Sequence, residues 1–117
     1  MRTLGSDATY PLVIDVYESA IDATGRFGAV FERDDETAFF YLLDLRLPEG
    51  NQIAEAFNAH TVTQMPGETP AAVEWSSTGE VVGLHAGGAL IAVFDLRNDA
   101  RQGRWATDED ARLFVRH

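Results

Sequence analysis

The chain has 117 residues, the usual size of one domain, and its 45% apolar and 24% charged residues are typical of a globular protein. Its formal net charge is −10, and all nine basic residues are arginine. A charge of this sign repels phosphate backbones and anionic lipid, so we expect neither nucleic-acid nor membrane binding, and instead a basic protein or a cation as partner. The absence of cysteine excludes disulfides, thiol catalysis and thiolate metal sites.

We expect a single domain over residues 1–117, in which residues 1–10 form a loose N-terminal leader. This leader has one basic residue and no apolar run, so it does not have the pattern of a signal peptide. No stretch of the chain approaches the ~20 apolar residues that a membrane span requires. The expected location is therefore the cytoplasm.

The first half of the chain is rich in strand signals. Residues 11–17 (PLVIDVY) are β-branched enough for a first strand, and residues 22–25 (DATG) have turn chemistry. Residues 26–32 alternate between apolar and other side chains, and residues 37–45 (TAFFYLLDL) are apolar on both faces. The polar break between these two segments predicts a hairpin. Because both faces of the second strand favour burial, we expect it to be central in its sheet.

Residues 51–60 (NQIAEAFNAH) fit two patterns. Ile53 and Phe57 lie about one helical turn apart, behind Asn51 as a plausible N-cap. With Glu55 between them, the same two residues also fit the alternation of a strand. The alanine content favours a short helix, which we predict here.

The second half of the chain begins with a loop at residues 63–70, which contains two prolines and a glycine. Three strands separated by short turns are predicted at residues 71–76, 80–85 and 89–96. The last of them (ALIAVFDL) is apolar on both faces, and residues 98–103 read as a loop.

Residues 107–117 have the charge pattern of a helix. Thr107 can cap it, acidic residues fill the first turn, and basic residues lie towards the end. Together the elements predict an α+β fold: one twisted, mostly antiparallel sheet of about six strands with one or two short helices.

Two predicted strands are similar to each other, since residues 38–46 read AFFYLLDLR and residues 89–97 read ALIAVFDLR. We interpret them as two similar hairpin strands, neighbours in one sheet, and not as a repeat. Each ends in an aspartate two residues before an arginine, which alternation places on the same face. A salt bridge at each strand end, Asp44 with Arg46 and Asp95 with Arg97, is the simpler interpretation. An acid/base pair formed by the two aspartates is the alternative.

The segment from Phe31 to Asp44 (FERDDETAFFYLLD) resembles the signature of a family of small uncharacterised bacterial proteins, which reads roughly FEDDGETGYFYALD. Val73–Ser76 resembles the tryptophan strand that follows in this family, and Ala92–Asp95 its AVFDF strand. The two glycines of the signature fall on Asp35 and Ala38, so the turn must be built differently here. The resemblance implies a β-rich domain of unknown function and carries no catalytic residue.

The densest polar feature is the acidic cluster Glu32, Asp34, Asp35 and Glu36. Its spacing does not match a calcium loop, and no glycine permits the sharp bend of one. We interpret this cluster as a solvated hairpin tip.

The three histidines, His60, His85 and His117, are not spaced as metal ligands. The chain has neither a phosphate-binding glycine loop nor a nucleophile elbow. We therefore assign no catalytic, cofactor-binding or metal-binding residue and expect no cofactor.

Two functions of different classes remain. The first is a small acidic, non-enzymatic protein-binding module, similar in kind to immunity proteins or inhibitors, which docks a basic protein. Homodimers could also form through an edge strand. The candidate interaction surface comprises Asp34, Asp35, Glu36, Trp105, Asp108 and Asp110.

The alternative is a small-ligand-binding or enzymatic domain with a pocket between sheet and helix. The residues that would line this pocket are Tyr41, His60, Trp75 and His85.

Overall fold

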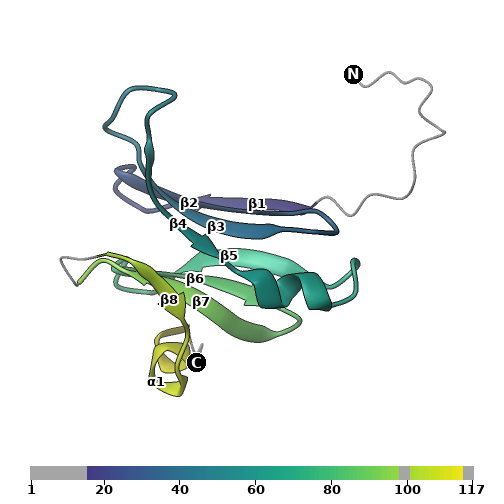
Figure 1. Ribbon diagram of the computed structural model, residues 1–117. Helices are drawn as coiled ribbons and strands as arrows, with labels where there is room; N and C mark the ends of the chain where they lie inside the picture. Colours follow the sequence, from purple (N-terminus) through teal and green to yellow (C-terminus); the bar gives the residue numbers. More distant parts are fainter. Residues whose placement is uncertain (1–15, 98–100, 115–117) are drawn as a thin grey trace.

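The computed structural model describes residues 16–97 and 101–114, which form two stacked antiparallel sheets (Figure 1). Each sheet has four strands in chain order. The first sheet contains β1 (Val16–Ile21), β2 (Phe27–Arg33), β3 (Ala38–Asp44) and β4 (Ile53–Asn58). The second contains β5 (Ala71–Trp75), β6 (Val81–Ala86), β7 (Ala89–Asp95) and β8 (Gly103–Trp105). Both sheets are simple meanders.

The prediction of one sheet with about six strands was wrong, because the eight strands divide into two sheets. The mostly antiparallel arrangement with few and short helices is confirmed. Two short helices cannot cover the inner face of a large sheet, so each meander buries its apolar face against the other. Residues 11–15 of the predicted first strand lie outside the described residues.

The core lies between the two sheets and is built largely from β2, β3, β6 and β7, with β3 and β7 contributing its central rings. Phe40 and Phe94 meet across the interface, with 4.7 Å between their ring centroids. These strands are the third strands of their respective meanders, so the prediction that they are neighbours in one sheet was wrong. Both lie inside their sheets, as their apolar sequences indicated. The other large, fully buried core residues shared by the two sheets are Phe31, Leu42, Val62, Val82 and Leu84.

The predicted helix over residues 51–60 is instead strand β4, followed by the short 3₁₀ helix η2 (His60–Gln64). Pairing with β3 decides this outcome, because it places Phe57 opposite Phe40 and lets it pack against the core. The helix propensity of the three alanines in residues 51–60 amounts to only a few tenths of a kcal/mol each, which the burial of Phe57 exceeds. The strand alternative was therefore the correct interpretation.

The β2–β3 hairpin is confirmed, and the side chain of Asp34 stabilises its turn. Asp34 Oδ1 accepts hydrogen bonds from the backbone N–H groups of Glu36 and Thr37, at 2.8 and 2.7 Å. This capping by a side chain replaces the glycine-dependent turn that the resembling signature would require. The strands that flank the turn pair in register from Phe27–Asp44 to Arg33–Ala38.

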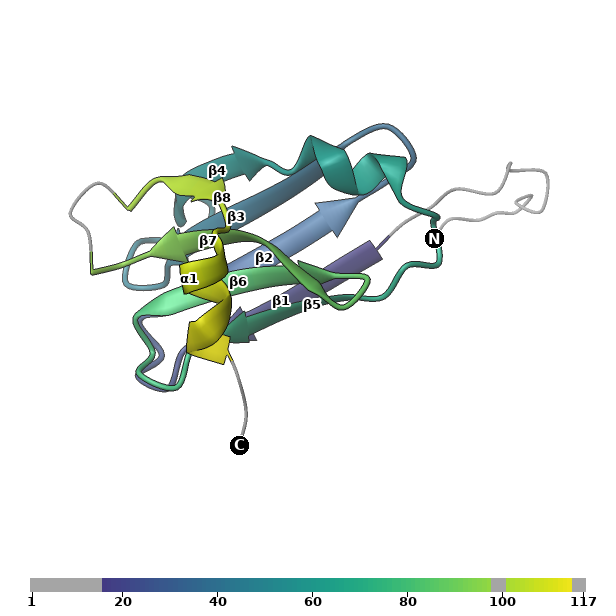
Figure 2. The ribbon, with the colours of Figure 1, turned by 90° about the horizontal axis from the view of Figure 1, so that it is seen from below.

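The C-terminal residues form a third layer on the second sheet (Figure 2). Helix α1 (Asp108–Ala111) continues into the 3₁₀ helix η3 (Arg112–Phe114). Thr107 caps α1 as predicted, through a reciprocal pair of hydrogen bonds with Asp110. The predicted end of this helix, residues 115–117, falls outside the described residues. Within residues 16–97 and 101–114, no helix is long and apolar enough to cross a membrane.

Candidate functional site

The outer face of the first sheet is apolar, although no described element covers it. Strand pairing defines this face, because Ala29, Phe31, Phe40 and Leu42 belong to the core and alternate residues point away from it. Among the paired outward positions of β1–β4, Glu32 is the only charged one. The face consists of Tyr17, Ser19, Ile21, Gly28, Val30, Glu32, Phe39, Tyr41, Leu43, Ile53, Ala56 and Asn58. We call it the β1–β4 outer face.

Several side chains of this face are strongly exposed. Tyr17 is 63% exposed, Ile21 66% and Ile53 60%, while Phe39 and Tyr41 are half-buried. An antiparallel sheet with one face in water normally presents polar residues there. A contiguous apolar face of this kind is typical of interaction sites.

The corresponding face of the second sheet is covered. Phe114 of η3 packs edge-on against His85, with 5.2 Å between the ring centroids, and lies over Gly83. Gly83 and Val93, which pair on this face, are both buried. The two outer faces of the sandwich therefore differ: the second sheet has a C-terminal cover, and the first has none among the described residues (Figures 1 and 2).

A hollow of about 180 Å³ opens where the β1–β4 outer face meets the β2–β3 hairpin. Phe39 and Tyr41 form one side of it, with stacked rings whose centroids are 6.1 Å apart. Glu32 lies directly opposite Phe39 on the neighbouring strand. The residues that line the hollow are Glu32, Arg33, Asp34, Thr37, Phe39 and Tyr41.

Two carboxylates, Glu32 and Asp34, and one guanidinium, Arg33, line the hollow, so its formal charge is negative. Burial and the nearby charge of Glu32 raise the pKa of Tyr41, so its phenol stays neutral. Hydrogen bonds from the backbone of Glu36 and Thr37 lower the pKa of Asp34, so this carboxylate stays charged. The hollow thus combines two aromatic rings with two carboxylates and the buried guanidinium of Arg33, and its remaining negative charge suits a cation.

The arginine Arg33 at the end of β2 is buried, with 3% of its surface exposed. Its guanidinium donates to two backbone carbonyls, those of Asp34 and Met65, both at 3.4 Å. Its Nη1 is buried with no hydrogen-bond partner among the described residues. The contact with Met65 links β2 to the segment that leads into the second sheet.

The opposite end of the first sheet carries arginines. The guanidinium carbons of Arg26, Arg101 and Arg46 lie 4.6, 5.3 and 5.9 Å from the ring centroid of Phe27. Phe27 is the first residue of β2, and the hollow lies beside the hairpin that follows the last residue of this strand. The basic group and the acidic hollow therefore lie at opposite ends of β2.

The two aspartate–arginine pairs predicted at the strand ends are both present. Arg46 Nη2 lies 2.8 Å from Asp44 Oδ2, and Arg97 Nη2 lies 2.8 Å from Asp95 Oδ2. Hydrogen bonds from Arg46 lower the pKa of Asp44 to about 2. The two aspartates lie in different layers: Asp44 is on the inner side of the first sheet, opposite the core residue Phe27, whereas Asp95 is on the outer side of the second sheet, near Arg104. They therefore do not form an acid/base pair.

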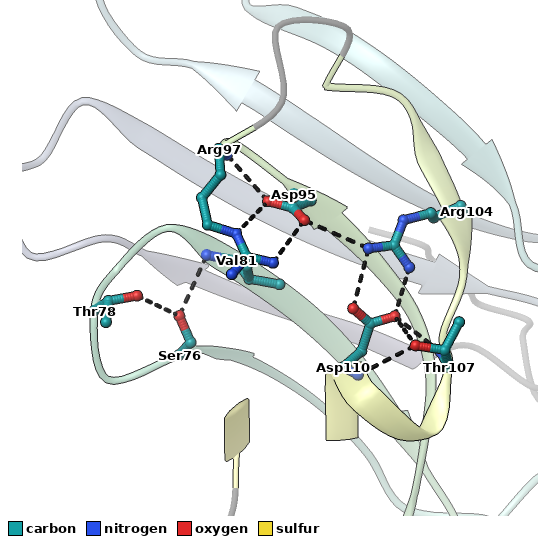
Figure 3. A network of polar contacts seen from close by, with 8 residues as sticks. All are labelled: Ser76, Thr78, Val81, Asp95, Arg97, Arg104, Thr107 and Asp110. Carbon is teal, nitrogen blue, oxygen red and sulfur yellow. Dashed lines mark hydrogen bonds and ion pairs between the residues drawn. The ribbon is translucent and has the colours of Figure 1, made fainter. Parts of the chain in front are cut away.

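Asp95 belongs to a larger polar network beneath α1 (Figure 3). Arg104 Nη2 donates to Asp110 Oδ1 at 3.0 Å and lies 3.4 Å from Asp95 Oδ2. The buried Asp110 also accepts a hydrogen bond from the backbone N–H of Thr107 at 2.8 Å. The hydrogen bonds of Arg104 are the main cause that lowers the pKa of Asp110. This network holds the cover of the second sheet in place.

The four residues of the candidate pocket do not meet. Tyr41 lies on the β1–β4 outer face, whereas His85 packs against Phe114 on the far side of the second sheet. His60 lies next to Trp105, with 5.3 Å between the ring centroids. Trp75 packs against the core, and its Nε1 donates to the carbonyl of Ala20 at 3.1 Å, which links β5 to β1.

The candidate interaction surface is also divided. Asp34, Asp35 and Glu36 lie in the hairpin of the first sheet, whereas Asp108 and Asp110 lie in α1 under the second. Trp105 is 40% exposed, and its ring packs edge-on against Phe57 at 4.8 Å between centroids. Within the described residues, no group of three or more histidines and carboxylates is placed to hold a metal ion.

The family model of uncharacterised proteins conserved in bacteria, DUF2251, matches residues 14–111. The chain belongs to this family. The match includes all eight strands and α1, so the β1–β4 outer face and the hollow both lie inside the family domain. The predicted resemblance to a family of uncharacterised bacterial proteins is thus confirmed. No curated protein and no solved structure matches the chain.

Most of the β1–β4 outer face was missed from the sequence. Tyr17, Ile21 and Ile53 were not singled out, and Glu32 was placed in a solvated acidic cluster. One signal was available, because residues 37–45 are apolar at successive positions and so must present Phe39 and Tyr41 on the face opposite the core. The sequence could not indicate that no other element among residues 16–97 and 101–114 covers that face.

Proposed function

We propose that this chain is a non-enzymatic protein-binding domain that docks its partner on the β1–β4 outer face. The observation that supports this most strongly is the difference between the two outer faces. One is sealed by α1 and η3, while the other leaves Tyr17, Ile21 and Ile53 in water. Burial of apolar surface is the dominant favourable contribution to most protein–protein associations, so such a face favours a partner.

The residue types support a protein as the partner. Tyrosine and phenylalanine are enriched at the centres of interfaces, and charged residues are depleted there. Phe39 and Tyr41 are half-buried on the inner strand β3, and the more exposed Tyr17 and Ile53 lie on the edge strands β1 and β4. A few residues near the centre of an interface, often aromatic, usually provide most of the binding energy.

The net charge favours a basic partner. At −10, the chain attracts positively charged proteins and accelerates their encounter. The hairpin acids Asp35 and Glu36 are exposed beside the β1–β4 outer face. The acids of α1 lie under the other sheet, so we place the docking surface at β1–β4 and not at α1 or Trp105.

The ligand-binding or enzymatic alternative receives no comparable support. It requires Tyr41, His60, Trp75 and His85 to converge, and the structure holds them on different faces of the sandwich. We therefore propose no reaction.

The proposal is tested by affinity capture from a bacterium that carries the protein, with three tagged chains. They are the wild type, the face variant Tyr17→Ser/Ile53→Ser, and the control Leu47→Ser, which changes another exposed apolar residue in the β3–β4 loop. All three positions are exposed, so the fold should be retained, which urea unfolding checks. The wild type and Leu47→Ser should recover the same protein in near-equal molar amount, and the face variant should lose it. Equal recovery by all three chains, or no protein at any salt concentration, contradicts the proposal.

A further inference from the structure

We propose that the hollow beside the β2–β3 hairpin receives an arginine side chain of the docked partner. This inference rests on the proposed function and names the chemistry of its partner. The occupant is a protein segment that lies on the β1–β4 outer face. It carries an arginine whose side chain contacts Glu32, Phe39 and Tyr41.

The first argument is the position of Glu32. Its two direct cross-strand partners on the face are aromatic: Tyr17 on β1 and Phe39 on β3. Tyr41 follows two residues after Phe39, on the same face, and stacks against it. Side chains at such positions lie within reach of one another across a sheet. The only charge of the face is therefore surrounded by three aromatic rings.

The second argument is that this charge has no counterion in the described part of the chain. Glu32 has neither an ion pair nor a hydrogen bond there, and it raises the pKa of Tyr41. Arg33 also lines the hollow, but its guanidinium is buried and donates to the carbonyls of Asp34 and Met65. Two other carboxylates of low exposure are paired, by contrast: Asp44 with Arg46, and Asp110 with Arg104. If a partner covered Glu32 without offering a positive charge, binding would incur the full cost of desolvating the Glu32 carboxylate.

The third argument concerns Asp34 at the mouth of the hollow. Its Oδ1 is occupied by the turn, where it accepts hydrogen bonds from Glu36, Thr37 N and Thr37 Oγ1. Its Oδ2 makes no hydrogen bond with the described residues, and this carboxylate keeps its charge because the turn lowers its pKa. A second negative charge thus lies beside the same two rings.

Arginine fits this combination better than lysine. A planar guanidinium can lie over a tyrosine or phenylalanine ring while its edge donates two parallel hydrogen bonds to a carboxylate. The ammonium of lysine is more strongly hydrated and acts as a point charge. A metal ion is a poorer fit, because hard cations require six or more oxygens and two carboxylates supply too few.

The test uses a defined probe, the tripeptide acetyl-Leu-Arg-Leu-amide, which presents one arginine between two apolar side chains. Its binding to the full chain is followed by NMR shifts of the Phe39 and Tyr41 rings and of the Glu32 amide. The same peptide with citrulline is the matched control, because citrulline has the shape of arginine without its charge. A lysine version separates guanidinium recognition from simple charge attraction.

The arginine peptide should produce saturable shifts confined to the hollow. We expect the citrulline peptide to bind at least about tenfold more weakly, and the lysine peptide to fall between the two. In the protein, Glu32→Gln should lower the affinity for the arginine peptide by a similar factor. Glu68→Gln, which removes the same charge from the loop after η2, should leave the affinity unchanged.

Three results would overturn the inference: equal binding of the arginine and citrulline peptides, equal affinity of Glu32→Gln and Glu68→Gln, or no saturable shift at the hollow. These outcomes are separable from failure of the proposed function. If Tyr17→Ser/Ile53→Ser lost the partner and Glu32→Gln retained it, the docking function would be supported and the arginine inference contradicted. If the arginine peptide bound but no partner were recovered, arginine recognition by the hollow would be supported and the docking function contradicted.

Discussion

Gly103 of β8 lies directly against Phe57 of β4, at the edge where the two sheets approach each other. A Cβ atom at position 103 would lie 2.7 Å from the Cβ of Phe57 and 2.9 Å from the Cε1 atom of Phe94. Neither atom can move freely, because one is attached to the backbone of β4 and the other belongs to the central core ring. The absence of a side chain at position 103 therefore sets how closely the two sheets approach.

We predict that Gly103→Ala lowers the free energy of unfolding by about 1–3 kcal/mol, the usual cost of overpacking. Urea unfolding followed by tryptophan fluorescence measures this change. Gly28→Ala is the matched control, since a Cβ there meets its nearest neighbour at 3.6 Å, an ordinary contact. That substitution should be neutral or stabilise the chain by roughly 0.5–1 kcal/mol. If both variants lost the same stability, the close approach at Gly103 would not be the cause.

A second prediction concerns the ion pair at the end of β3. Asp44 should titrate with a pKa of about 2, because Arg46 donates hydrogen bonds to both of its carboxylate oxygens. In Arg46→Gln the pKa should move towards its ordinary value of 3.8. NMR titration of the Asp44 carboxyl carbon measures both values.

The sign of the pH effect follows from this lowered pKa. The folded chain holds the Asp44 proton more weakly than the unfolded chain does, so the pair stabilises the fold above about pH 4. That contribution is lost as the pH falls from about 4 to about 2. An Asp44 pKa that is the same in the wild type and in Arg46→Gln would show that the pair does not form in solution.

The third prediction concerns His85, whose ring is half-buried under Phe114. Burial lowers the pKa of His85 below its ordinary value of 6.5, and its Nδ1 has no hydrogen-bond partner among the described residues. Below about pH 6.5 the unfolded chain therefore takes up a proton that the folded chain resists, and stability falls. Urea unfolding at pH 7.5 and 5.5 should show this loss in the wild type and a smaller loss in His85→Leu. If the wild type and His85→Leu lost equal stability between pH 7.5 and 5.5, groups other than His85 would be responsible.

The sequence predicted well those features that depend on neighbouring residues. The β2–β3 hairpin, the Thr107 cap and the two aspartate–arginine pairs each involve groups within a few positions of one another. Their chemistry is visible in a short stretch of sequence, so the structure agrees with it. Strand β7 was also predicted, because its continuous apolar run leaves few other options.

Features that depend on distant pairing were predicted poorly. Residues 51–60 favour a helix in isolation, and only the partner strand β3 makes β4 a strand. The assignment of β3 and β7 to different sheets depends on how two meanders stack, which local patterns do not encode. The β1–β4 outer face was missed for the same reason, since Tyr17 and Ile53 become neighbours of β2 and β3 only after the sheet has formed.

A fourth prediction tests where the partner approaches. Asp35→Lys/Glu36→Lys reverses two exposed charges beside the β1–β4 outer face, and Asp108→Lys/Glu109→Lys reverses two on α1. Asp34 and Asp110 are left intact, because their carboxylates hold the hairpin turn and the α1 cap. The hairpin variant should slow association with the captured partner several-fold at low salt, with less effect on dissociation. Stopped-flow mixing measures both rates, and a larger slowing by the α1 variant would move the docking surface to the second sheet.

The most direct test of the docking face is a cross-saturation NMR experiment on the complex with the captured partner. Saturation of the partner's protons should reach the methyl groups of Ile21, Val30, Leu43 and Ile53, which lie on the β1–β4 outer face. The methyl groups of Leu90 and Leu113, on the side of the second sheet that α1 and η3 cover, should stay unaffected. Saturation of Leu113 and the α1 region, with none at Ile21 and Ile53, would contradict the account.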